Sequence, residues 1–314
     1  MRNNVFYFLI FLVVIFTYQF LVSSLSSTKE DKTYKQEFYS KYAIFSVVQP
    51  QTIHFANETI PLTNHRIWER LDKELLKNTY WQSNTLLYIK RANKYFPIIE
   101  PILKANNIPE DFKYLAVIES GLEDVVSPAG AAGFWQIMKS TGKEYGLEIN
   151  HEIDQRYHLE KATQFACKYL NDAYDKFGSW TMSAAAYNMG INGAMKSITN
   201  QGSNNYYNLY LNNETSRYIF RILAVKTIMD SPKDYGFIVR KKDLYPILAT
   251  KNILLNKSNV DIVQYAKDLG LNYKILREYN PWIRSSNITN SKNTEYKISV
   301  PIEQETIFLD YVKK

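Results

Sequence analysis

Glu119 is the residue of this 314-residue chain whose surroundings best suit acid–base chemistry. It ends an apolar run that includes Ile118, and the small residues Ser120 and Gly121 follow it. If that run is a helix, Glu119 lies at its C-terminal end, where the helix dipole and partial burial both raise the pKa of a carboxyl group. A single protonated Glu can donate a proton and then accept one, provided that the substrate supplies its own nucleophile.

Two alternatives remain open for Glu119 taken alone. The first is a surface position at the end of its helix, without a chemical role. The second is a partnership with another carboxylate, because two-carboxylate glycosidases often draw their acids from distant segments. The nearest acids, Glu123 and Asp124, show no spacing that indicates such a partnership.

The segment after Glu119 combines small, polar and aromatic residues. Gly130-Ala131-Ala132-Gly133 allows a close approach of backbone segments, and Trp135-Gln136-Ile137-Met138 alternates apolar groups with an amide. Such a mixture suits a sugar, whose ring faces contact apolar groups and whose substituents need hydrogen bonds. The alternative is a glycine-rich turn ahead of a helix that begins at Phe134, with Trp135 in the core.

Two later segments complete the set of candidate groups. The alanine run Ala184-Ala185-Ala186 permits tight helix contact, and Tyr187 and Asn188 project where Gly190 terminates that helix. In Glu214-Thr215-Ser216-Arg217-Tyr218, Thr215 is expected to cap a long helix and Tyr218 lies one turn further in. The alternative for the first segment is an ordinary helix end.

Composition excludes several other classes of site. The 38 Lys and Arg against 31 Asp and Glu give a net charge of +7. The basic residues are scattered, so we do not expect nucleic-acid binding. Cys167 is the only cysteine, which excludes an internal disulfide; its helical surroundings favour a small core residue over a nucleophile. The four histidines lack metal-ligand spacing, so a metal site is not expected: His54, His65, His151 and His158.

The N-terminal segment is almost continuously apolar from residue 5 to residue 22, after Arg2 and before a polar stretch. Its 18 residues exceed a usual signal-peptide core and approach the length that spans a bilayer. An uncleaved membrane anchor is favoured over a cleaved signal peptide, and a buried core helix is a third alternative. Residues 1–22 are therefore predicted to export the protein, and residues 23–50 to form a linker.

The remaining pattern predicts a mainly α protein with a small α+β module at its C-terminal end. Helices are expected from Leu62, from about residue 86, from Pro97 to about residue 107, from Pro109 to Gly121 and from Phe134. Others are expected over residues 159–177, 181–186 and 215–229. Residues 51–232 thus form an all-helical domain. Residues 233–314 are predicted to contain extended pieces, two short helices (260–269 and 273–279) and a strand (296–301).

The order of these segments resembles a known family. ES, SPxGAxGxWQxM, AYNxG and ETxxY look like the catalytic domain of the lytic murein transglycosylases, in the superfamily of the soluble transglycosylases and goose-type lysozymes. The resemblance is greatest to the membrane-bound D-type branch and covers about residues 55–230; the segment from Asp154-Gln155-Arg156 to Tyr169 shares it. It implies a lysozyme-like fold.

The same resemblance implies a role for particular residues. The single catalytic acid of the family corresponds to Glu119. The residues that would line the glycan groove are Ser127, Gln136, Met138, Tyr187, Asn188, Glu214 and Tyr218. Two departures are visible: the turn between Glu119 and Ser127 is one residue shorter than in many relatives, and no proline follows Met138. The first departure bears on the role of Ser127.

The implied reaction, which needs no cofactor, is cleavage of the β-1,4 bond between N-acetylmuramic acid and N-acetylglucosamine, with formation of a 1,6-anhydro ring. It would take place in the cell envelope, on the periplasmic side, and its partners would be peptidoglycan strands and the membrane. Residues 261–301 are similar to a degenerate LysM module, which either binds glycan or only packs against the catalytic domain. A lysozyme-like hydrolase and a non-catalytic peptidoglycan-binding protein are the rival interpretations. No protein partner is identifiable.

Overall fold

The computed structural model describes residues 15, 31–38, 40, 44–291 and 294–302. By its internal contacts the chain divides between Ser46 and Val47. Residues 31–38 of the first unit are helical. The predicted membrane anchor, residues 5–22, lies outside the described residues apart from position 15. Within the described part of the chain, no helix is both long and apolar enough to cross a membrane.

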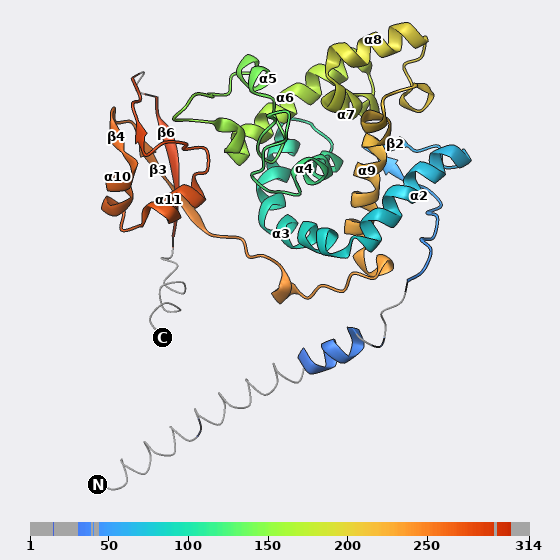
Figure 1. Cartoon of the computed structure of the whole chain (residues 1–314), viewed down its shortest axis with the longest axis horizontal. Coiled ribbons are helices and arrows are strands. Elements are labelled where there is room, and N and C mark those ends of the chain that lie inside the picture. Colours follow the sequence, from blue (N-terminus) through green and yellow to red (C-terminus); the bar gives the residue numbers. More distant parts are fainter. Residues whose placement is uncertain (1–14, 16–30, 39, 41–43, 292–293, 303–314) are drawn as a thin grey trace. The chain divides into compact units, whose positions relative to one another are not determined.

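The second unit begins with a short hairpin and continues as a helical domain (Figure 1). The hairpin pairs β1 (His54–Phe55) with β2 (Glu58–Thr59) in antiparallel register. The helices are α2 (His65–Tyr80), α3 (Gln82–Ala105), α4 (Lys113–Ser120), α5 (Lys139–Glu144), α6 (Leu159–Phe177), α7 (Trp180–Met189), α8 (Ile191–Gln201) and α9 (Asn213–Asp230). Short 3-10 turns lie at Glu110–Phe112, Gln155–Tyr157, Tyr206–Asn208, Pro232–Tyr235 and Lys241–Asp243.

The helix α4 lies in the middle of this domain, among α3, α7 and α9 (Figure 1). Its residues Leu115, Ala116 and Val117 are fully buried. The predicted alanine run of α7 is fully buried as well, because alanine side chains let α7 approach both α6 and α9 closely. Glu58 accepts hydrogen bonds from the backbone N–H groups of Trp180 (2.5 Å) and Thr181 (3.0 Å) at the start of α7, which joins the hairpin to the domain.

The predicted helix start at Pro97 is wrong. The helix α3 runs from Gln82 to Ala105 with Pro97 and Pro101 inside it. A proline in a helix interior costs about 3 kcal/mol. The side chains of Ile99 and Leu103 are fully buried in the core. Their burial contributes about 1.5–3 kcal/mol each, which offsets that cost.

Two other local expectations also fail. No helix begins at Phe134: the chain forms a tight loop in which Gly133 (φ +76°) and Gln136 (φ +46°) both have left-handed backbone conformations, and α5 begins only at Lys139. Thr215 does not cap α9, because the side chain of Asn212 accepts the hydrogen bond from the Thr215 N–H, 2.8 Å away. The helix α8 was not expected.

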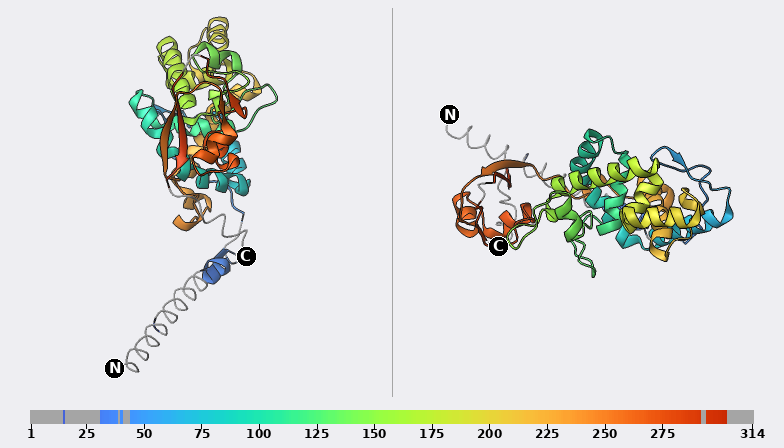
Figure 2. Two further views of the ribbon diagram at one scale, coloured as in Figure 1. Left: turned by 90° about the vertical axis from the view of Figure 1, so that its left-hand side faces the viewer. Right: turned by 90° about the horizontal axis from the view of Figure 1, so that it is seen from above.

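The C-terminal module has the predicted β-α-α-β order (Figure 2). The strand β3 (Thr250–Leu255) pairs with β6 (Tyr296–Pro301) in antiparallel register, from Thr250 opposite Pro301 to Leu255 opposite Tyr296. Between them lie α10 (Ile262–Asp268) and α11 (Tyr273–Tyr279), and a second short pair of β4 (Val260–Asp261) and β5 (Asn287–Ile288). Alternate side chains of β6 enter the core of the module, as expected for a strand with one buried face.

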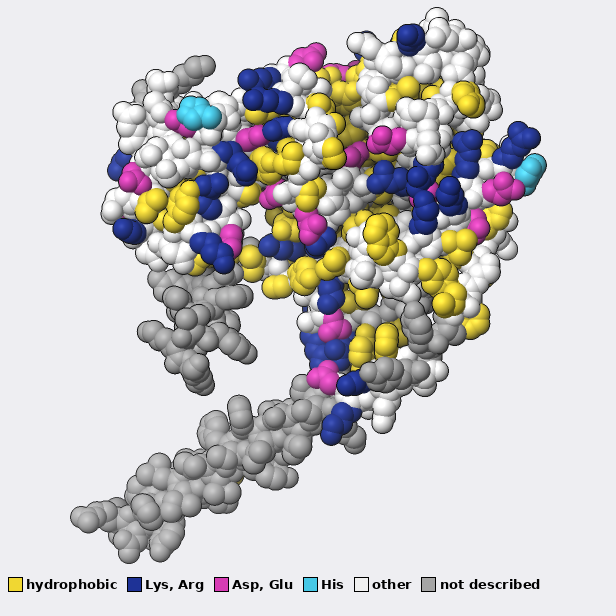
Figure 3. Space-filling view, in the orientation of Figure 1, with side chains coloured by type: hydrophobic (Ala, Val, Ile, Leu, Met, Phe, Trp, Pro, Cys, Tyr) yellow, Lys and Arg dark blue, Asp and Glu magenta, His cyan; other side chains and the backbone are white. Residues whose placement is uncertain are grey.

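Basic side chains are distributed over the face that Figure 3 shows. Lys and Arg side chains lie among acidic and hydrophobic ones there, and several of them gather at its right-hand side.

Candidate active site

Glu119 lies on the last turn of α4, as predicted. The helix ends at Gly121, whose backbone is left-handed (φ +66°) and whose N–H donates to the carbonyl of Val117 (2.8 Å). This ending fixes the direction in which the Glu119 side chain leaves the helix. The hydroxyl of Tyr218, on α9, donates a short hydrogen bond to Glu119 Oε1. Two helices that are distant in the sequence therefore meet at one carboxyl group.

The environment of Glu119 favours its protonated form. Loss of hydration in the partly buried site raises the pKa of Glu119, and the negative charge of Glu214 adds to this effect. The hydrogen bond from Tyr218 and the positive charge of Arg221 act in the opposite direction, but burial is the largest effect. Arg221 is itself held in place because its guanidinium donates to the carbonyl of Ile118 (2.6 Å).

Ser120 connects α4 to the loop that follows it. Its hydroxyl donates to the carbonyl of Phe134 (2.9 Å) and accepts from the N–H of Leu122 (3.1 Å). The sequence motif included Ser120, but its neighbours gave no indication of this contact, which spans 14 positions. The position of the loop relative to Glu119 depends on it.

That loop, residues 125–137, folds back on itself. Ala132 forms antiparallel bridges with both Val126 and Ile137. The Ser127 hydroxyl accepts from the Ala131 N–H (3.0 Å), so Ser127 closes the turn at the tip of the loop. The amide nitrogen of Gln136 donates to the carbonyls of Val125 (3.0 Å) and Gly133 (2.9 Å). Within the described residues, the amide oxygen of Gln136 has no hydrogen-bond donor and is available to a ligand.

The two aromatic residues Trp135 and Tyr187 differ in their exposure. Trp135 is fully buried and its Nε1–H donates to Thr163 Oγ1 (2.9 Å), so Trp135 is a core residue. Tyr187, at the end of α7, is half-buried, and its hydroxyl donates to the carbonyl of Trp135 (2.8 Å). Burial raises the pKa of Tyr187 well above its usual range, and the charge of the nearby Glu119 adds to that effect.

A small polar cluster joins the end of α7 to the start of α9. The Asn188 amide nitrogen donates to Glu214 Oε1 (3.0 Å), and its oxygen accepts from the Thr215 hydroxyl (2.7 Å). Tyr187, Glu214 and Tyr218 are thus connected to Glu119 by a contact or by charge, and Asn188 is connected through Glu214, although these residues come from segments about 70 to 100 positions away.

Two protein-family models match parts of the chain. The model of the transglycosylase SLT domain matches residues 96–210, which include Glu119 and the loop beside it. Residues 96–210 belong to the transglycosylase SLT family. The model of the soluble lytic transglycosylase C-terminal LysM-like domain matches residues 251–304, which is the β-α-α-β module.

Two curated relatives align with most of the chain. Over 233 residues, the chain is 32% identical to proteins named membrane-bound lytic murein transglycosylase D from two strains of Escherichia coli. The alignment covers 72% of this chain and 50% of each relative. The chain therefore spans about half the length of the curated relatives that it matches.

Two solved structures also show similarity. The 70 kDa soluble lytic transglycosylase from Escherichia coli is 23% identical, with a TM-score of 0.38, and the match covers 48% of this chain and 26% of that one. An inactive mutant of the lytic transglycosylase Slt from Pseudomonas aeruginosa is 18% identical, with a TM-score of 0.37, over 49% of this chain and 26% of that one.

One residue predicted to line the groove, Tyr218, lies on α9, beyond residues 96–210 that the SLT model matches. Tyr218 is fully buried behind Glu119 and has no surface from which to line a groove. Its hydroxyl instead contacts the carboxyl group of Glu119. Met138, in contrast, is 43% exposed at the start of α5, and Glu214 is exposed as well. Sequence reasoning did not identify Arg221, although its position three residues after Tyr218 places both on one side of α9.

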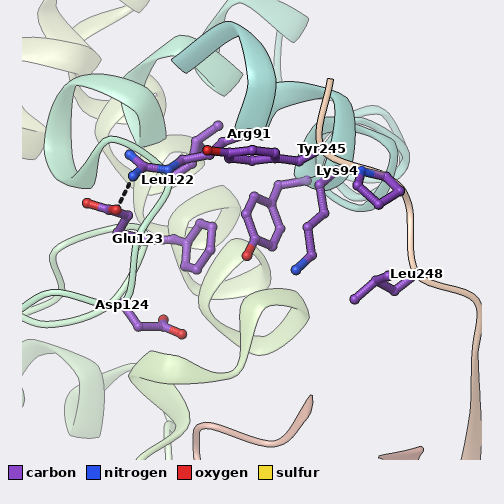
Figure 4. Close-up of a pocket in the computed structure, with 10 residues that line it drawn as sticks. Arg91, Lys94, Leu122, Glu123, Asp124, Tyr245 and Leu248 are labelled. Atoms are coloured by element: carbon purple, nitrogen blue, oxygen red, sulfur yellow. Dashed lines mark hydrogen bonds and ion pairs between the residues drawn. The ribbon is translucent and has the colours of Figure 1, made fainter. Parts of the chain in front are cut away.

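A separate pocket of about 430 Å³ lies between α3, the segment after Glu119 and the segment that precedes β3 (Figure 4). Figure 4 shows Arg91 paired with Glu123 at one side of the pocket and Leu248, in the segment before β3, at the other. Loss of hydration there raises the pKa of Asp124 to about 6, against the positive charges of Arg284 and Lys94. None of the predicted groove residues lines this pocket.

The described residues include no group of three or more His, Cys, Asp or Glu side chains placed to hold a metal ion.

Proposed function

We propose that this protein is a lytic transglycosylase that cleaves the β-1,4 bond between N-acetylmuramic acid and N-acetylglucosamine in peptidoglycan, with Glu119 as the only catalytic carboxyl group. The observation that carries the proposal is the position of Glu119 in the SLT domain: a partly buried carboxyl group at a helix end, with a raised pKa and one oxygen held by Tyr218.

The first step uses the protonated form of Glu119. The carboxyl proton passes to the glycosidic oxygen, and the bond between that oxygen and C1 of the muramic acid breaks. The N-acetyl carbonyl oxygen of the same sugar attacks C1 and forms a cyclic oxazolinium ion. Tyr218 keeps the Glu119 carboxyl group in one orientation through its hydrogen bond, because its own position is fixed by complete burial.

The second step uses the carboxylate that remains. Glu119 takes the proton of the C6 hydroxyl, O6 attacks C1, and the oxazolinium ring opens to restore the N-acetyl group. The product is a 1,6-anhydro ring, and water is not consumed. Since Glu119 ends the cycle protonated, one residue is acid and then base, and a second carboxylate is not needed.

The rest of the chain is assigned accordingly. We place the catalytic domain at residues 51–232 and the LysM-like module at residues 233–314, after an N-terminal export segment (residues 1–22) and a linker (residues 23–50). Ser127, Gln136, Met138, Tyr187, Asn188 and Glu214 contact the glycan strand in this proposal. The protein acts outside the cytoplasm on the cell wall, anchored to the membrane by residues 5–22 or released from it.

Mass spectrometry of the muropeptides from purified cell wall tests the proposal. Wild-type protein should release 1,6-anhydro products, which are lighter by one water than the reducing products of a hydrolase. Glu119→Gln should release neither, while Glu144→Gln, an exposed acid on α5, should behave as the wild type. Equal turnover by wild type and Glu119→Gln would exclude Glu119 as the acid. Products with reducing ends alone would identify a lysozyme-like hydrolase instead.

A further inference from the structure

The C-terminal module is joined to the SLT domain by a short backbone ladder. The Asp154 N–H donates to the carbonyl of Trp282 (2.8 Å), and the Arg284 N–H donates to the carbonyl of Glu152 (2.7 Å). Ile153 and Ile283, between these two bonds, form an antiparallel bridge. The segment 152–154 thus adds to the module as an extra strand would. A loosely tethered binding module would not share backbone hydrogen bonds with the domain beside it.

Side chains extend this interface on both sides of the ladder. The Thr289 hydroxyl and N–H donate to the two oxygens of Glu152 (2.6 and 3.0 Å). The Tyr296 hydroxyl lies 3.0 Å from Glu148 Oε2. All of these acceptors belong to the one stretch of the SLT domain between α5 and α6.

The hydrophobic core of the module also includes residues of the SLT domain. Ile153, Tyr157 and Ala132 are buried in the same cluster as Trp282 and Ile283. Ile153 is 1% exposed and Ala132 is fully buried. Two of these three side chains come from the stretch between α5 and α6, and Ala132 comes from the loop beside Glu119. Neither surface would be covered without the other.

Arg156 connects this interface to the loop of residues 125–137 through hydrogen bonds. Its guanidinium forms an ion pair with Asp154, with Nε 3.0 Å from Oδ1 and Nη2 2.7 Å from Oδ2. Its remaining nitrogen, Nη1, donates to the carbonyls of Gly130 (2.9 Å) and Ile137 (3.1 Å), one at the tip and one at the end of the loop. Both Arg156 and Asp154 are buried, so water does not compete for these bonds.

The backbone of Arg156 holds the loop from a second direction. A Cβ atom added to Gly133 would lie 2.0 Å from the carbonyl oxygen of Arg156. The loop is therefore in direct backbone contact with Arg156 at Gly133, between the two carbonyls that the guanidinium holds. Residues 125–137 cannot move without disturbing Arg156.

We propose that Arg156 is a positioning residue of the active site, and that the LysM-like module holds it in place by docking on residues 148–158. The ladder fixes Asp154, Asp154 orients Arg156, and Arg156 fixes the loop that carries Ser127 and Gln136 next to Glu119. The module is then a structural part of the glycan groove. That this loop lines a glycan groove rests on the proposed function. The contacts that connect the module to the loop through Arg156 do not depend on it.

Hydrogen exchange of the full-length protein without substrate tests the coupling. In the double variant Thr289→Val/Tyr296→Phe, the shapes of both side chains are kept while their hydroxyl hydrogen bonds to Glu152 and Glu148 are lost; the N–H of residue 289 keeps its bond to Glu152. The amides of Ala132, Gly133 and Ile137 should then exchange about tenfold faster than in the wild type. Ser299→Ala is the matched control, because it removes an exposed side-chain hydrogen bond of the same module, to Asn252, away from the interface.

The outcomes separate the alternatives. Unchanged exchange in the loop of the double variant, or an equal increase in Ser299→Ala, would overturn the proposal. This readout does not depend on turnover, so it stands even if the muropeptide assay rejects the proposed reaction.

Arg156 itself offers a second test. Arg156→Lys keeps a positive charge opposite Asp154 but cannot reach both loop carbonyls, whereas Arg156→Met loses the charge as well. We expect KM for glycan strands to rise in the order wild type, Arg156→Lys, Arg156→Met, with kcat changed less than KM because Glu119 and Tyr218 stay in place. Loop exchange should follow the same order. A fall in kcat at unchanged KM, or loop exchange equal to that of the wild type, would contradict a positioning role.

Discussion

The hydroxyl of Tyr218 donates a hydrogen bond to the carboxyl group of Glu119, across 99 positions of sequence and between α9 and α4. This contact gives the acid a fixed orientation and lowers its pKa, while burial raises it. The pKa of Glu119 is raised on balance, because burial is the largest effect. Substitution of Tyr218 or of Glu119 alters the hydrogen bond or the buried charge separately.

Tyr218→Phe should move the alkaline limb of kcat/KM to higher pH. The first step requires protonated Glu119, so activity falls as the pH rises through its pKa. Removing the hydrogen bond removes an effect that lowers this pKa. The rate below the limb should fall about tenfold, because the carboxyl group is held less firmly. A pH–rate profile measures both changes. Tyr206→Phe, whose hydroxyl donates to the carbonyl of Thr215, should leave the limb in place; a shift of the Tyr218→Phe limb to lower pH would refute the assignment.

Glu119→Gln should make the folded protein more stable at neutral pH. Because the pKa of Glu119 is raised in the folded state, its contribution to stability is fully present below the unfolded pKa and is lost as the pH rises through the folded pKa. Glutamine has no charge to bury, so the variant should gain in the free energy of unfolding at pH 7. Denaturant unfolding at a series of pH values should show this gain shrinking toward about pH 4. A gain that is independent of pH would exclude the ionisation as its cause.

Gly133→Ala should destabilise the protein more than Gly130→Ala. Both glycines have left-handed backbones, so either substitution introduces strain of about 1 kcal/mol. Only at Gly133 would the new Cβ collide with a backbone oxygen, that of Arg156, and such overpacking adds about 1–3 kcal/mol. Thermal unfolding of the two variants compares them directly. Equal losses would show that the contact between Gly133 and Arg156 is not tight in solution.

Cys167 should not react with thiol reagents in the folded protein. It is fully buried, and burial raises the pKa of its thiol to about 12. The thiolate is the reactive form, so neither access nor ionisation favours modification. Labelling at pH 8 should be slow in the native protein and complete in denaturant. Rapid labelling of the native protein would contradict its place in the core.

Local signals in the sequence determined a large part of this structure. The helix that ends at Gly121, and with it the position of Glu119, follows from an apolar run before a glycine that adopts a left-handed conformation easily. The bounds of α6 and the β-α-α-β order of the module follow from hydrophobic periodicity, since the period of a pattern depends only on neighbouring residues. The sequence also placed Tyr187, Asn188, Glu214 and Tyr218 in motifs near helix ends.

Only the tertiary structure decided how these pieces meet. It buried Tyr218 behind Glu119, kept α3 continuous through Pro97 and replaced the expected helix at Phe134 with a tight loop. It also joined the module to the SLT domain through Asp154 and Arg156. Each of these outcomes depends on groups that are distant in sequence, whose packing and hydrogen bonds outweigh local preferences of about 1–3 kcal/mol. The position of Glu119 at a helix end could therefore be predicted from the chain alone, whereas the contacts that hold it and its neighbouring loop could not.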